Sequence, residues 1–209
     1  MLAGPYIINL AHRTDRYKVI KKQFSLLGIP ITRVEGVYMK EDGAAGCMIS
    51  HINALKDAPA DATAVWICED DCRIEVSADE LQLNIAAFMA STAEVLCLGY
   101  NSRKEVAFNT VFKRTLDNQT RTAYIVKASI RPYLLKLWET VLDSRKHKTE
   151  HPWKSLYLGL PIHNPEFERG DQCWKILQQD HVFVIPKKRL ATQMESFSDI
   201  ENTVVNYAC

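Results

Sequence analysis

Three consecutive acids, Glu69, Asp70 and Asp71, directly follow an apolar run at 64–68 (Ala-Val-Trp-Ile-Cys). The run predicts a buried strand, and carboxylates at the carboxyl end of a strand lie where α/β sheets bind ligands. Adjacent carboxylates repel one another, and a divalent cation with oxygen ligands would offset that repulsion. A solvated acidic turn is the competing interpretation, because acidic side chains are mostly exposed. The triplet by itself does not separate the two interpretations.

A basic segment ends another predicted strand, 6–10, and contains Arg13 and Arg16 three residues apart, after Asn9. A helix N-terminus attracts anions and arginine can bond two phosphate oxygens at once, which favours a nucleotide site. The alternative is a solvated basic helix start. The sequence contains no G-x-G-x-x-G or G-x-x-x-x-G-K signature, which argues against a Rossmann dehydrogenase and a P-loop enzyme.

A third polar segment is 46–51 (Gly-Cys-Met-Ile-Ser-His), at the start of a predicted helix. Its Ser50 and His51 are candidates to face a ligand at the sheet edge. Taken alone, His51 is better interpreted as a packed, hydrogen-bonded helix residue.

These segments need a scaffold, and apolar periodicity predicts one in which strands alternate with helices. Alternation of this kind is typical of an α/β domain with a mostly parallel central sheet flanked by helices. In the first half the predicted strands are 6–10, 32–37, 63–68 and 94–98, and the predicted helices are 15–27, 47–56 and 77–89. In the second half we expect a strand at 121–126, a helix at 129–142, a mobile polar loop at 143–151, an ordered loop region at 153–169, a short helix at 172–177 and a strand at 181–185.

Composition excludes several classes of protein. The chain has 209 residues, of which 47% are hydrophobic and 24% are charged, as expected for one sizeable core. The formal net charge of +1 provides no global attraction to nucleic acid or acidic membranes. No signal peptide and no membrane-spanning stretch are evident.

The cysteines point to a reducing compartment. None of the six forms a C-x-x-C pair, and Cys68 and Cys97 lie in apolar runs that read as core strands. We therefore expect a soluble, cytoplasmic protein. The abrupt end at Cys209 leaves open whether the chain is one domain of a longer protein.

Taken together and in order, these short motifs resemble glycosyltransferase family 25, which includes lipooligosaccharide and collagen galactosyltransferases. The matching segments span nearly the whole chain, at 6–16, 46–51, 64–71, 122–126, 170–174 and 196–200. The segments 103–121 and 153–169 depart from the family's pattern, so the acceptor is not transferred from the family.

The resemblance implies a single GT-A-type domain, with a nucleotide-binding part at about 1–100 and an acceptor side at about 101–209. It implies inverting, metal-dependent transfer of a hexose from a nucleotide-sugar, with UDP-galactose or UDP-glucose as donor. The acceptor would be a hydroxyl of a glycan or glycoprotein. Mn²⁺ or Mg²⁺ suits the oxygen ligands, whereas Zn²⁺ would favour more His or Cys.

The resemblance also assigns roles to residues. Asp71 is the expected metal ligand, and Asp171 the expected catalytic base, with Glu168 as the nearest substitute. The alternative for Asp171 is the N-cap of the helix predicted at 172–177. The expected donor-binding residues are Asn9, Arg13, Arg16, Ser50, His51, Glu69, Asp70, Ser198 and Asp199.

Tryptophans give a weaker signal. Trp66 and Trp138 fit core positions, whereas Trp153 and Trp174 lie near polar loops where an exposed indole could stack on a sugar, although packing is the default.

Two other functions use the same residues. A metal-dependent phosphohydrolase would release phosphate without a sugar acceptor. A non-catalytic module for nucleotide-sugars or glycans would bind without turnover.

Overall fold

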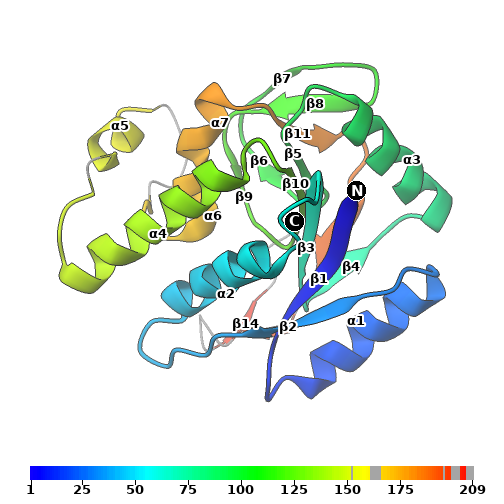
Figure 1. Ribbon diagram of the computed structural model, residues 1–209, viewed down its shortest axis with the longest axis horizontal. Coiled ribbons are helices and arrows are strands. Elements are labelled where there is room, and N and C mark those ends of the chain that lie inside the picture. Colours follow the sequence, from blue (N-terminus) through cyan, green and yellow to red (C-terminus); the bar gives the residue numbers. More distant parts are fainter. Residues whose placement is uncertain (152, 161–165, 195, 199–202, 206–209) are drawn as a thin grey trace.

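A computed structural model describes residues 1–151, 153–160, 166–194, 196–198 and 203–205. Its centre is an eight-stranded sheet with the strand order β2-β1-β3-β10-β5-β11-β8-β7, covered by helices on both faces (Figure 1). The strands of this sheet are β1 (Leu2–Leu10), β2 (Thr32–Gly36), β3 (Ala64–Glu69), β5 (Val95–Cys97), β7 (Glu105–Ala107), β8 (Phe112–Thr115), β10 (Ala123–Lys127) and β11 (Phe183–Pro186).

Strand direction makes the sheet mostly parallel but mixed. Strands β8 and β10 run antiparallel to both of their neighbours, and the other six point the same way. The predicted α/β domain with helices flanking its sheet is confirmed. Strands from both halves of the chain interleave, because β10 lies between β3 and β5.

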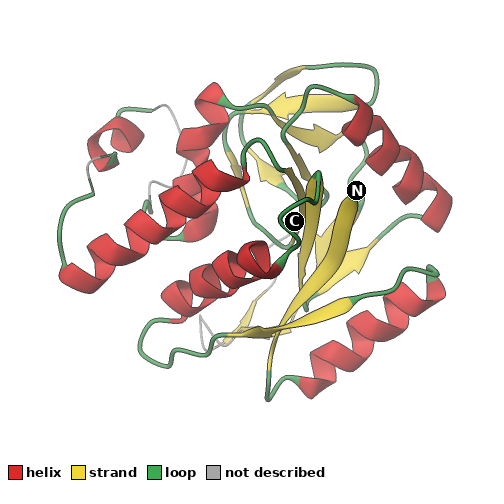
Figure 2. Cartoon of the chain, in the orientation of Figure 1, coloured by secondary structure: helices red, strands yellow, loops and turns green. Residues whose placement is uncertain are grey.

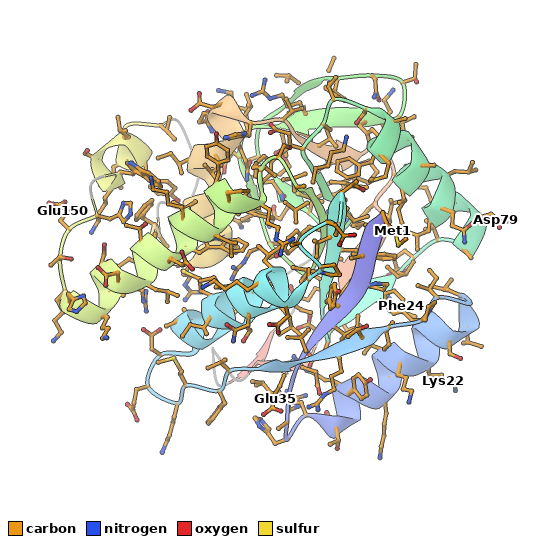
Figure 3. All side chains as sticks on the ribbon, viewed as in Figure 1. Met1, Lys22, Phe24, Glu35, Asp79 and Glu150 are labelled. Carbon is orange, nitrogen blue, oxygen red and sulfur yellow. The ribbon has the colours of Figure 1, made fainter. Side chains whose placement is uncertain are left out.

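Long helices form the outer layers on both faces of the sheet, as the secondary-structure colouring in Figure 2 shows. Helices α1 (Thr14–Leu26) and α3 (Ala78–Ala90) cover one face, and α2 (Gly43–Asp57) and α4 (Arg131–His147) cover the other. Within β3, Trp66 packs into the α1/α3 cluster and Ile67 into the α2/α4 cluster, as alternation along a strand requires. Figure 3 shows Phe24 of α1 turned toward the sheet and Lys22 turned outward.

Smaller elements complete the chain. The short helices are α5 (Lys154–Leu158), α6 (Gly170–Cys173), the 3₁₀ turn η1 (Trp174–Ile176) and α7 (Leu177–Asp180). The small antiparallel pairs are β4 (Cys72–Ile74) with β12 (Ala191–Gln193), β6 (Asn101–Ser102) with β9 (Asn118–Gln119), and β13 (Ser196–Ser198) with β14 (Thr203–Val205). In the part of the chain that is described, no helix combines the length and apolarity needed to cross a bilayer.

Helix α2 begins earlier than predicted, and a long-range ion pair explains part of the difference. The carboxylate of Asp42 accepts a hydrogen bond from the Ala45 backbone N–H at 3.0 Å, as an N-cap does. The same carboxylate binds the Arg145 guanidinium at 2.6 Å. Arg145 belongs to a segment predicted as a mobile loop, but α4 continues through it to His147. The predicted loop at 143–151 is therefore wrong over its first half.

Close packing joins the start of α2 to the end of β2. The Oγ of Ser50 accepts a hydrogen bond from the Val37 N–H at 2.8 Å and donates one to the Gly46 carbonyl at 2.7 Å. A Cβ placed on Gly46 would lie 2.5 Å from the Val37 carbonyl oxygen. The helix can approach this backbone only because residue 46 lacks a side chain.

We predict that Gly46→Ala lowers the free energy of unfolding by about 1–3 kcal/mol, because the new methyl group must push backbone apart. Urea denaturation measures this change. Gly159→Ala is the matched control, since the nearest atom to its Cβ lies 3.5 Å away and its effect should stay within about 0.5 kcal/mol. Equal effects at the two positions would contradict the packing argument.

Candidate functional site

The acidic triplet ends β3 beside the carboxyl end of β1, and the two strands are parallel neighbours. The Oδ2 of Asp70 accepts a hydrogen bond from Asn9 Nδ2 at 2.7 Å. The Nη1 of Arg16 lies 3.0 Å from Asp70 Oδ1 and 3.3 Å from Asp71 Oδ2. Both aspartates are only 6% exposed. The structure therefore brings Asn9, Arg16 and the acids together, and the competing solvated acidic turn is wrong for Asp70 and Asp71.

Asp71 is enclosed by the strand β12 and by its own turn. Its Oδ2 accepts a hydrogen bond from Gln193 Nε2 at 3.0 Å, and its carbonyl accepts one from the Met194 N–H at 2.8 Å. The buried Oδ1 has no hydrogen-bond donor among the residues that the structure describes. Burial first, and the negative charge of Glu69 second, raise the pKa of Asp71 to about 7.

Glu69 points away from its two neighbours into a buried polar chain. Its Oε1 lies 2.9 Å from His51 Nε2 and 3.6 Å from Cys47 Sγ, and His51 Nδ1 lies 3.0 Å from the Tyr124 hydroxyl. Burial lowers the pKa of His51 to about 4, so the ring is neutral. Burial acts to raise the pKa of Glu69, but the His51 hydrogen bond and the charge of Arg121 outweigh it and hold that pKa below its usual value.

These protonation states fix the direction of the hydrogen bonds. The ionised Glu69 carboxylate can only accept, so His51 carries its proton on Nε2 and donates to it. The Tyr124 hydroxyl then donates to Nδ1 of the ring. His51 is completely buried and Ser50 is occupied by backbone groups. This burial corrects the prediction that Ser50 and His51 contact the donor directly. Both side chains lie beneath the surface of the site, and His51 influences that surface only through its hydrogen bond to Glu69.

Arg13 lies at the start of α1, close to the same edge. Its backbone carbonyl accepts a hydrogen bond from Asn9 Nδ2 at 2.9 Å, and its guanidinium bonds the carboxylate of Asp15 at 3.0 and 3.1 Å. The Arg13 hydrogen bond, acting against the effect of burial, lowers the pKa of Asp15 to about 2. Arg13 thus lies at the edge of the site, and the carboxylate of Asp15 is its ion-pair partner.

Asp171 reaches this site from the other half of the chain. Its Oδ2 accepts a hydrogen bond from the Thr120 N–H at 3.4 Å, and the Thr122 carbonyl accepts one from the Glu69 N–H at 2.8 Å. The segment 120–122 therefore joins the candidate base to the acidic turn. Thr120 has a φ of +83°, which is strained for a β-branched residue.

The N-cap alternative for Asp171 is wrong. Residue 169 is the N-cap of α6, so Asp171 is the second residue of that helix. The helix predicted at 172–177 is replaced by α6, η1 and α7. Glu168, the substitute base, is exposed and lies 3.4 Å from Arg145 and 3.9 Å from Lys154. Of the remaining donor-site predictions, Asp199 and the side chain of Ser198 lie outside the described residues.

Sequence reasoning missed Arg121, a buried residue that enters β10 with 5% of its surface exposed. Its Nη2 donates to Cys47 Sγ at 3.3 Å, and its Cζ lies 5.0 Å from the centroid of the Trp138 ring. A Cβ on Gly170 would lie 2.6 Å from that Cζ. The sequence carries no motif for this role, because an arginine before an apolar strand usually marks a surface.

The tryptophans are mainly structural. Trp66, Trp138 and Trp174 are buried, so the default interpretation of packing is confirmed for Trp174. The Nε1 of Trp174 donates to the Asn118 carbonyl at 2.9 Å, which removes it from sugar stacking. Trp153 is partly buried and packs on His151, with 5.2 Å between the ring centroids.

Three potential metal-ligating atoms also gather here, on Cys47, His51 and Glu69, within 4.8 Å of one another. Each already takes part in the hydrogen bonds described above, and the guanidinium of Arg121 contacts the sulfur. Burial raises the pKa of the Cys47 thiol to about 12. The five cysteines in the described part of the chain are free.

Comparison with known proteins gives no assignment of family. No protein-family model matches the sequence, and no curated protein matches it either. Solved structures are similar to the chain at low sequence identity. The chain is similar to 4-diphosphocytidyl-2C-methyl-D-erythritol synthase from Anaerococcus prevotii at 12% identity and a TM-score of 0.43, covering 94% of this chain and 74% of that one.

Two other proteins are similar over nearly their whole length. A glycosyltransferase involved in the glycosylation of the major capsid of PBCV-1 shares 13% identity at a TM-score of 0.42, over 94% of each chain. Protein A197 from STIV shares 10% identity at a TM-score of 0.44, over 98% of this chain and 92% of that one. Likenesses at this level are compatible with many activities on one architecture, and none of them assigns a function to this chain.

The pKa of Asp71 leads to a prediction about stability. Because the folded-state pKa is about 7 and the ordinary value is 3.8, the folded protein keeps a proton that the unfolded chain has released between these values. Without divalent cations, the contribution of Asp71 to stability should therefore fall as the pH rises from about 4 to about 7 and remain low above that. Asp71→Asn should flatten this dependence and stabilise the protein at pH 8.

Urea midpoints measured in EDTA at pH 5 and pH 8 test this expectation. Asp61→Asn is the control, because that side chain is exposed and should leave the wild-type pH dependence unchanged. A wild-type slope that persists in Asp71→Asn would show that Asp71 does not carry it.

Proposed function

We propose that the chain is a metal-dependent, inverting glycosyltransferase of GT-A type. It would move a hexose from a nucleotide-sugar, UDP-galactose or UDP-glucose, to a hydroxyl of a glycan or glycoprotein. The observation that carries the proposal is the enclosed acidic turn, in which Asp71 Oδ1 has no donor among the described residues, with Arg16 beside it. The link from Asp171 to Glu69 through the segment 120–122 supports a transfer reaction rather than binding alone.

The residues of the turn fit a hard divalent cation. Asp71 presents a buried carboxylate oxygen that receives no hydrogen bond from the residues described, and Asp70 lies beside it. Oxygen ligands of this kind suit Mn²⁺ or Mg²⁺. Such a cation, when bound, stabilises the charge that develops on a diphosphate leaving group. Arg16 neutralises only one of the two aspartates.

The chain's own side chains supply the remaining steps. Arg16 and Arg13 flank the N-terminus of α1, where helix dipole and guanidinium groups favour the phosphates of a donor. Glu69 is held in one orientation by His51, so its free carboxylate oxygen is pre-positioned for a donor hydroxyl. Asn9 fixes Asp70 and the first turn of α1 relative to each other.

Asp171 would act as the general base. Its carboxylate takes the proton of the acceptor hydroxyl while that oxygen attacks the anomeric carbon, and the bond from this carbon to the diphosphate breaks. A single displacement of this kind inverts the anomeric centre. Asp171 is partly exposed, which allows an acceptor to reach it, whereas Glu168 already faces Arg145.

We predict that UDP-sugars raise the melting temperature in the presence of Mn²⁺ and that Asp71→Asn abolishes this shift. Ligand at a hundred times its dissociation constant stabilises the folded state by about 2.7 kcal/mol, which a thermal-shift assay resolves. Asp61→Asn should behave as wild type. A full Mn²⁺-dependent shift in Asp71→Asn would contradict the metal assignment, and release of phosphate without an acceptor would instead indicate a phosphohydrolase.

We predict that Asp171→Asn binds the donor normally but lowers the kcat of transfer by about 10²–10⁴-fold, the usual contribution of a general base. Glu168→Gln is the matched control and should keep its activity. Donor binding by calorimetry and transfer by product analysis separate the two effects. Loss of transfer in Glu168→Gln with unchanged transfer in Asp171→Asn would reverse the assignment, and binding without turnover in wild type would indicate a non-catalytic module.

A further inference from the structure

Arg121 is a buried arginine in a slot built to hold it. The Trp138 ring lies on one side of the guanidinium, and Gly170 lies where any side chain would collide with it. The Trp138 Nε1 donates to the Gly170 carbonyl at 3.1 Å, so the two walls of the slot are joined. Three elements, α4, α6 and β10, thus meet around one charged group.

Hydrogen bonding does not account for an arginine at this position. Two of its nitrogen atoms, Nε and Nη1, find no acceptor within the described part of the chain. Apolar residues that replace a buried charge together with its charged partners are often neutral or stabilising, so packing alone does not require an arginine here. The positive charge of Arg121 must therefore explain why an arginine occupies this position.

Acidic groups face that charge from two different elements. Glu69 at the end of β3 is reached through the Cys47 sulfur, and Asp171 in α6 directly follows Gly170, against which the guanidinium packs. The other titratable groups that face it are the thiols of Cys47 and Cys173, the His51 ring and the Tyr124 hydroxyl. The Cys47 sulfur links Arg121 to Glu69. Arg121 Nη2 donates to Cys47 Sγ at 3.3 Å, and this sulfur lies 3.6 Å from Glu69 Oε1.

We propose that Arg121 is a positioning residue, the shared buried counter-charge that holds the carboxylates of Glu69 and Asp171 together on one side of the site. Two carboxylates in a poorly solvated region repel each other, and a cation between them offsets that repulsion. The effect of Arg121 on sugar transfer rests on the proposed function, since Arg121 acts on the reaction only through Glu69 and Asp171.

The competing explanation for this cluster is a metal ion held by Cys47, His51 and Glu69. The three ligand atoms are close enough to one another. However, the guanidinium already occupies the surroundings of the sulfur, and a second cation there would be repelled. One equivalent of zinc in the purified protein, lost in Cys47→Ser, would overturn the proposal because the metal would then supply the charge.

A double-mutant cycle on stability tests the proposal without any assay of activity. Arg121→Met is introduced into wild type and into the Glu69→Gln/Asp171→Asn background, and urea midpoints are compared. The loss of midpoint should shrink by about half or more in the neutral background, because coupled sites are not additive. If Arg121→Met alone fails to fold, folding of the triple variant supports the proposal. An equal loss in both backgrounds, or failure of the triple variant to fold, would overturn it.

Activity provides a second readout. Arg121→Met should lower the kcat of transfer roughly tenfold or more, with a smaller change in the donor KM, and Arg121→Lys should recover most of it. Arg114→Met is the matched control, because that guanidinium donates to backbone carbonyls, those of Gln178, Gln179 and His181. Similar loss of kcat in Arg114→Met would indicate a merely structural effect. If no donor supports transfer, the proposed function fails while the stability cycle still decides the role of Arg121.

Discussion

The antiparallel pairing of β10 with β3 places the start of β10 beside the acids that end β3. If β10 ran parallel to β3, the segment 120–122 would lie at the opposite edge of the sheet. Because of this one pairing, the Thr122 carbonyl meets the Glu69 N–H, Thr120 meets Asp171, and Arg121 enters the core between them. Polar groups from the two halves of the chain form one site for this reason.

The pairing also divides the acidic triplet between two sets of polar partners. Asp70 and Asp71 turn toward α1, where Arg16 contacts both, and Glu69 turns toward α2, where the neutral His51 ring and Cys47 bond to it. Three adjacent carboxylates can be enclosed in this way because each side has its own source of hydrogen bonds and positive charge. Among the described residues, the buried Asp71 Oδ1 has no hydrogen-bond donor, and the proposed cation site rests on this oxygen.

Much of this was predictable from the sequence, and the exceptions share a cause. The buried strand at 63–68 and the convergence of Asn9 and Arg16 on the acids follow from apolar runs and from the shared edge of neighbouring parallel strands. The early start of α2 has a local signal, since aspartate at position 42 is a favoured N-cap. The extension of α4 has none, because Arg145 finds its partner about a hundred positions away at Asp42. Arg121 was equally hidden, since the direction of β10 depends on tertiary packing and not on strand propensity.

Gly170 carries a consequence for how this sequence can diverge. The guanidinium of Arg121 lies against its Cα so closely that a methyl group there would have to displace it. The two positions are 49 residues apart in the sequence, but the residue tolerated at one depends on the residue at the other. A side chain at 170 must move or shorten residue 121, and either change takes the cation away from the two carboxylates. Substitutions at positions 121 and 170 should therefore occur together, or together with the loss of one of the acids. Covariation of these positions among related sequences would then reflect the electrostatic coupling in the site.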